Sequence, residues 1–99
     1  MAKKPKDLET AFKLITEELL QTFIQKHKDY GKGNILSIKE LGIVFRETEK
    51  VERLKNLLLK DSDPQNETIE DTWTDIAVYA VIAQMYRRGW FQDLELDKK

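Results

Sequence analysis

Eight consecutive apolar residues, Ile76 to Ala83, constrain the fold of this chain more than any other feature of its sequence. They lie in a segment from about Glu67 to Arg88 that is followed by Gly89, a residue favoured just after a helix C-terminus. A helix that is apolar on every side needs cover on every side. A β-strand is the competing interpretation, because valine, isoleucine and tyrosine favour sheets. The sequence offers no partner strand, so we predict a helix.

Two further helices are predicted upstream of this segment. In the first, from Asp7 to about Lys28, apolar residues recur every three or four positions, and Asp7 is suited to the N-cap. The second begins at Ser37, with Glu40 three residues later in the capping-box pattern, and ends near Lys60. The apolar positions that carry these patterns are Leu8, Phe12, Ile15, Leu19 and Phe23 in the first helix and Leu41, Phe45, Val51, Leu54 and Leu58 in the second.

Turn-forming segments at 29–34 and 61–66 separate the helices. The second segment is short, so the helices on either side of it should be antiparallel neighbours. We therefore predict an all-α fold in which three long helices form a bundle, with one helical domain at 7–91 and flexible tails at 1–6 and 92–99. Three helices leave one flank of a four-helix arrangement open, and we expect a homo-oligomer to complete the bundle.

Composition excludes several classes of protein. The formal net charge of -1 argues against a nucleic-acid partner, because DNA-binding domains carry a basic excess. The absence of cysteine excludes a disulfide framework and a thiolate zinc site. The longest apolar run is far below the ~20 residues that cross a bilayer, and no signal-peptide core follows the basic N-terminus. We expect a cytoplasmic protein without a membrane partner.

Acidic residues open the third predicted helix. The helix dipole stabilises negative charge at an N-terminus, which accounts for Glu67 and Glu70 without any function. Asp75 lies deeper in the helix, one turn after Asp71 and on the same face, where like charges repel. A partly buried carboxylate needs a cation or a hydrogen-bond donor. The sequence leaves open whether Asp71 and Asp75 meet a metal ion or a basic side chain.

The second predicted helix offers partners for these carboxylates. Glu49 and Glu52 are three residues apart and could flank one groove, and carboxylates from two antiparallel helices could hold Mg²⁺. Arg46, Lys50 and Arg53 line an adjoining stripe and suit phosphate oxygens. The alternative for such a charged run is a solvated helix face with ordinary salt bridges.

The segment 26–34 combines two glycines, an asparagine, basic side chains and Tyr30, and could approach a phosphate or stack on a base. It lacks the spacing of a P-loop, and as a plain helix-terminal turn it would need no function. His27 has no second histidine near it, and we expect it at the surface. The candidate nucleotide-binding residues are Lys28, Tyr30, Lys32, Asn34, Arg46, Lys50, Arg53 and Tyr79.

Three stretches, KDYGKGN, LGIVFRETEKVERLKNLL and NETIEDTWTDIAVYAVIA, together resemble the nucleotide-modification-associated domain type 1 family of phages and bacteria over about residues 26–85. The layout is more distantly similar to the all-α nucleoside triphosphate pyrophosphohydrolases, the MazG and dimeric dUTPase relatives, which bind Mg²⁺ through ExxE and ExxD motifs. Glu49 and Glu52 match the first motif. The second does not match, because Thr72 stands three residues before Asp75.

The resemblance implies a nucleotide-binding domain, in the host cytoplasm if the chain is phage-encoded. It would be a Mg²⁺-dependent (deoxy)nucleoside triphosphate pyrophosphohydrolase with Glu49 and Glu52 as catalytic carboxylates. The metal ligands would be Glu49, Glu52, Asp71 and Asp75. A second hypothesis is a protein that binds or sequesters a nucleotide or signalling nucleotide without chemistry. A third is a helical protein-interaction module that uses Trp90, Phe91 and the third helix.

Overall fold

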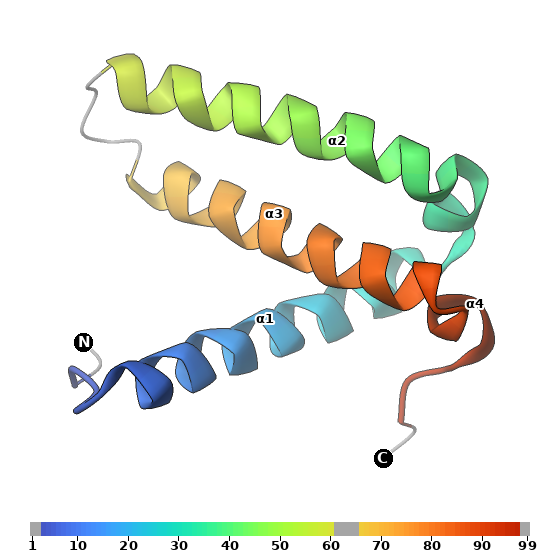
Figure 1. Ribbon diagram of the computed structural model, residues 1–99, viewed down its shortest axis with the longest axis horizontal. Coiled ribbons are helices and arrows are strands. Elements are labelled where there is room, and N and C mark those ends of the chain that lie inside the picture. Colours follow the sequence, from blue (N-terminus) through green and yellow to red (C-terminus); the bar gives the residue numbers. More distant parts are fainter. Residues whose placement is uncertain (1–2, 61–65, 98–99) are drawn as a thin grey trace.

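The computed structural model describes residues 3–60 and 66–97, and these residues form four helices. They are α1 (Leu8–Tyr30), α2 (Gly33–Lys60), α3 (Asn66–Arg87) and the short α4 (Trp90–Asp93). In Figure 1, α3 lies between α2 and α1, and α2 and α3 run antiparallel side by side. The molecule is flat, with extents of 40 × 32 × 23 Å. The predicted all-α class and its three long helices are thus confirmed, and the predicted turn at 61–66 lies largely outside the described residues.

Two helix-terminal residues have the roles that the sequence predicts: Asp7 caps the N-terminus of α1, and Gly89 follows the C-terminus of α3. The Asp7 carboxylate accepts a hydrogen bond of 2.7 Å from the Thr10 N–H, which lowers the pKa of Asp7 below its usual range. Gly31 ends α1 with a φ of 68°, and its N–H donates to the His27 carbonyl. Gly89 follows α3 with a φ of 79°, a backbone conformation that favours glycine.

The start of α2 differs from the prediction. The capping box at Ser37 and Glu40 is wrong, because the helix already begins at Gly33 and the Ser37 hydroxyl donates back to the Asn34 carbonyl at 2.8 Å. The helix instead bends at Lys39, whose φ of 61° and ψ of -170° are not helical. The bend changes which side of the later turns of α2 meets α3.

The bend at Lys39 gives a testable stability effect. Lys39 lies in a backbone region that side chains disfavour by about 1–3 kcal/mol and that glycine adopts freely. We expect Lys39→Gly to raise the free energy of unfolding by about 1 kcal/mol in urea denaturation. Lys55→Gly, in the straight part of α2, should lower it by about 1 kcal/mol. A loss of stability in both variants would contradict the bend.

A small apolar core lies where α2, α3 and α4 meet. Its buried members are Ile35, Ile43, Val78, Ile82 and Phe91. Leu19 and Phe23 of α1 pack against this cluster from the other side of α3. Phe91 is 5% exposed and packs into this cluster, whereas Trp90 is about half exposed beneath the Arg88 guanidinium. In the described part of the chain, no helix combines the length and apolar character needed to cross a membrane.

Candidate functional site

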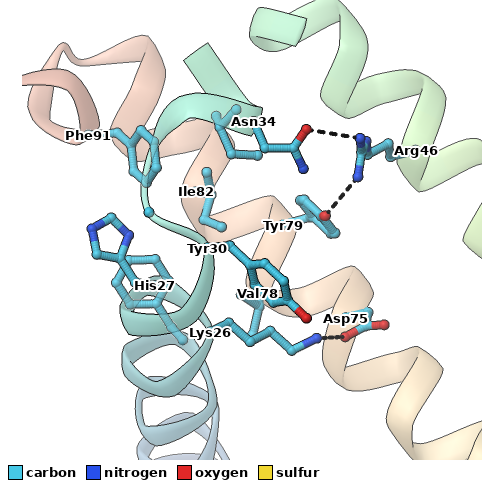
Figure 2. A pocket seen from close by; sticks show the side chains of 13 residues that line it. Lys26, His27, Tyr30, Asn34, Arg46, Asp75, Val78, Tyr79, Ile82 and Phe91 are labelled. Carbon is cyan, nitrogen blue, oxygen red and sulfur yellow. Dashed lines mark hydrogen bonds and ion pairs between the residues drawn. The ribbon is translucent and has the colours of Figure 1, made fainter. Parts of the chain in front are cut away.

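A cavity of about 300 Å³ opens between α1, the first turn of α2 and α3, with Phe91 of α4 at one end. Aromatic rings and polar groups share its wall, and Figure 2 shows them converging on one space. Such a combination of apolar lining and a few convergent polar groups is typical of small-molecule sites. The lining residues are Phe23, Lys26, His27, Tyr30, Gly31, Asn34, Ile35, Arg46, Asp75, Val78, Tyr79, Ile82 and Phe91.

Asp75 is held between two lysines from different helices. Lys26 of α1 donates to one carboxylate oxygen at 2.9 Å, and Lys50 of α2 donates to the other at 3.2 Å. Burial is the largest single influence on Asp75 and raises its pKa, but the two lysines together outweigh it and hold the pKa below its usual range. Asp75 therefore meets basic side chains in this structure.

Arg46 projects from α2 toward the cavity and is held by two neutral groups. Its guanidinium donates to the Tyr79 hydroxyl and to the Asn34 side-chain oxygen, each at 3.3 Å (Figure 2). The Lys50 ammonium lies 5.6 Å from the centre of the Tyr79 ring. Because both of its hydrogen-bond partners are neutral, Arg46 keeps an uncompensated positive charge at the cavity wall.

Aromatic residues form the opposite wall. The His27 ring lies 5.5 Å from the Phe23 ring and meets the Phe91 ring edge-on at 5.8 Å. His27 is thus half-buried between two aromatic rings, and the prediction that it lies at the surface is wrong. Tyr30 lies at the mouth, 76% exposed, so one face of its ring is accessible to a ligand.

Four of the eight candidate nucleotide-binding residues line the cavity. They are Tyr30, Asn34, Arg46 and Tyr79. Lys50 reaches the same region through Asp75. Lys28 and Arg53 are exposed and do not line it. Lys32 turns toward the C-terminal segment, where its ammonium donates to the Gln92 carbonyl and pairs with Glu95 at 3.0 Å.

The four proposed metal ligands, unlike half of the candidate nucleotide-binding residues, do not gather at the cavity. Glu49, Glu52 and Asp71 are exposed, and both oxygens of Asp75 are occupied by lysines. Within residues 3–60 and 66–97 no three histidine or carboxylate side chains form a group that could hold a metal, and the side chain of Glu67 lies outside the described residues. The described side chains therefore do not gather the four proposed ligands around one point, and the magnesium site stays a prediction.

Sequence reasoning missed two charged residues near Asp75. Lys26 shares one face of α1 with Phe23 and Tyr30, at spacings of three and four residues, and this pattern could have identified it. Glu47 has one buried carboxylate oxygen without a hydrogen-bond partner among the described residues. Burial raises the pKa of Glu47, the charge of Asp75 raises it further and Lys50 opposes both.

The cavity can chemically accommodate an anionic group beside a planar ring system. The region holds three cations, Lys26, Arg46 and Lys50. Its carboxylates are Asp75 and the neighbouring Glu47, so the described side chains carry a small excess of positive charge. Comparisons of the chain with protein-family models, with curated proteins and with solved structures found no match. The function is therefore argued from the geometry of the cavity.

Proposed function

We propose that this cavity binds a nucleotide. Its phosphate group would lie against Arg46 and beside Lys26 and Lys50, and its base would lie among the aromatic rings. The observation that carries the proposal is the neutral environment of Arg46: its two partners, Tyr79 and Asn34, orient the guanidinium without neutralising it. An arginine fixed in this way is suited to two parallel hydrogen bonds with phosphate oxygens. The resemblance of residues 26–85 to a nucleotide-associated family supports the same choice.

The aromatic wall supports a base rather than a free phosphate as part of the ligand. Tyr30 at the mouth is 76% exposed and provides a flat surface for stacking, and the rings of His27 and Phe91 line the cavity deeper in. Stacking of a base on an aromatic side chain contributes about 1–3 kcal/mol where it has been tested by alanine substitution. A volume of about 300 Å³ is at the lower end of ligand pockets, which favours one nucleotide over a longer oligonucleotide.

Asp75 has a positioning role in this proposal. Its carboxylate holds Lys26 and Lys50 at the rim, with one lysine on each oxygen. Binding without hydrolysis is therefore the form of the function that the side-chain arrangement favours. Hydrolysis with Mg²⁺ is the second outcome that the experiment distinguishes, and it requires a group of carboxylates that the described residues do not bring together.

Calorimetric titration with nucleoside mono-, di- and triphosphates, with and without Mg²⁺, tests the proposal. We expect binding without Mg²⁺, and we expect Arg46→Met to weaken it about ten- to a hundredfold, because hydrogen bonds to a charged group contribute about 1.5–3 kcal/mol. Arg87→Met is the matched control, since Arg87 is an exposed arginine paired with Glu40 outside the cavity. It should leave the affinity unchanged.

Two further results decide between the hypotheses. Tyr30→Ala should weaken the binding of a nucleotide but leave the weak binding of inorganic phosphate unchanged, because only the nucleotide has a base to stack. Release of pyrophosphate in the presence of Mg²⁺ would favour the pyrophosphohydrolase. If no nucleotide binds, or if both arginine variants bind as well as the unmodified chain, the nucleotide proposal is wrong and the interaction-module hypothesis gains support.

A further inference from the structure

The face of α3 opposite the cavity carries an exposed stripe that no described residue covers. Successive residues of a helix are rotated by about 100°, which places Asp75, Val78, Tyr79 and Ile82 on the cavity side. The opposite side is exposed but carries little charge in its middle. From the N-terminal to the C-terminal end, this α3 stripe consists of the exposed residues Glu70, Trp73, Ala80, Val81, Gln84 and Arg88, with the half-buried Ala77 among them.

Two apolar grooves border the α3 stripe. One runs between α2 and α3, where Val44 and Val51 face Ala80. The other runs between α1 and α3, where Leu20 faces Val81. Because Ala80 and Val81 are neighbours on the stripe, both grooves open beside it. The small side chains in the middle allow a second helix to approach closely, and the grooves can receive the larger side chains of a partner.

The charges at the two ends of the stripe are opposite. Glu70 is exposed near the N-terminal end of α3, and Arg88 is exposed just past its C-terminal end. Both lie at about the same angle around the helix axis, because the 18 residues from Glu70 to Arg88 turn the helix by about 1800°, which is five full circles. In an antiparallel pair of α3 helices, Glu70 of one copy would lie beside Arg88 of the other at both ends. The stripe is therefore complementary to itself.

The exposed area also calls for a partner. The chain exposes 8216 Å², whereas a compact monomer of 11.7 kDa exposes roughly 5,900 Å². A stable interface needs roughly 800 Å² from each partner. A face 40 Å long and 32 Å wide provides that area.

We propose that the α3 stripe and its two bordering grooves form the interface of a homodimer, in which α3 packs antiparallel against α3 of a second copy around a two-fold axis near Ala80. The cavity lies on the other face of the layer and stays open in this dimer. The interface does not depend on the nucleotide proposal, and either can fail without the other.

Sedimentation velocity on the intact chain with reversed charges tests this pairing. Glu70→Arg and Arg88→Glu should each weaken the dimer at least about tenfold, because each places like charges opposite each other at both ends. The double variant should recover the dimer to within about threefold of the unmodified chain. Recovery would support the antiparallel register. A monomeric unmodified chain, or single variants that dimerise normally, would overturn it.

Two matched pairs of variants distinguish loss of the dimer from loss of the fold. Val81 and Leu14 are each 49% exposed, but only Val81 belongs to the stripe. Val81→Glu should produce a monomer with an unchanged helical circular-dichroism spectrum, and Leu14→Glu should stay dimeric. Because the chain has no cysteine, Ala80→Cys supplies a single thiol. On oxidation, this thiol should form a disulfide with the same cysteine of the second copy, whereas the thiol of Leu14→Cys should not. The reverse pattern in either pair would overturn the proposed interface.

Discussion

Replacing Ile43 with alanine is expected to lower the free energy of unfolding by about 2–5 kcal/mol, the range found when large aliphatic side chains are removed from a core. Ile43 is 1% exposed, and among the described residues it is the largest side chain that is fully buried. It belongs to the cluster that joins α2 to α3. Small domains have only about 5–15 kcal/mol of stability in total, so the variant should lose a large part of it.

Urea denaturation followed by circular dichroism measures this effect. Leu41→Ala serves as the control, because Leu41 lies two residues away in the same helix but is 65% exposed. Its substitution should change the free energy of unfolding by no more than about 0.5 kcal/mol. Comparable losses in the two variants would show that Ile43 does not hold the position described, and would contradict the packing of α2 on α3.

Substitution of Asp75 by asparagine is expected to cost about 1–2 kcal/mol at pH 7, since Lys26 and Lys50 would then share one region without their common anion. The pH dependence follows from the lowered pKa of Asp75 in the folded state. Its stabilising effect is complete above the unfolded-state pKa of about 3.9 and is lost as the pH falls through the lower folded-state pKa. The difference in the free energy of unfolding between Asp75→Asn and the unmodified chain should therefore disappear in strongly acidic solution.

Thermal unfolding of both proteins between neutral and strongly acidic pH gives this comparison. Glu40→Gln is the control, because it breaks the ion pair with Arg87, whose side chain is 74% exposed. Such a surface pair contributes less than about 1 kcal/mol. The unfolding temperatures of Asp75→Asn and the unmodified chain could instead differ by a constant amount through the acidic range. That result would mean that the ionised carboxylate is not what stabilises this region.

Local sequence patterns predicted the helices themselves well. Asp7 and Gly89 mark a start and an end correctly, because a cap depends on residues within one turn of it. The buried face of α2 was harder to predict. Of the five apolar positions that continued the pattern there, only Leu54 is buried, and Ile43 takes the central place instead. The bend at Lys39, which no local signal announces, sets the orientation of the later turns.

In the candidate site, too, local signals identified some residues and tertiary packing determined the others. Asp75 could be recognised because a carboxylate well inside an apolar helix needs a partner. Its partner Lys26 is 49 residues away in the sequence, and Lys50 is 25 away, so the pairing depends on tertiary packing rather than on spacing. The motif spacing of Glu49 and Glu52 pointed to the exposed side of α2, whereas Glu47, outside any motif, turned out to be partly buried.

The position of α1 at the edge of the layer has a consequence for ligand affinity. α1 packs mainly on α3, and its N-terminal half leaves Leu8, Phe12 and Ile15 exposed. Elements with few buried contacts open at low free energy, so the amide protons of α1 should exchange before those of α3. Yet α1 supplies Lys26, His27 and Tyr30 to the cavity. A ligand of this cavity therefore selects the docked state of α1, and its apparent dissociation constant rises in inverse proportion to the docked fraction.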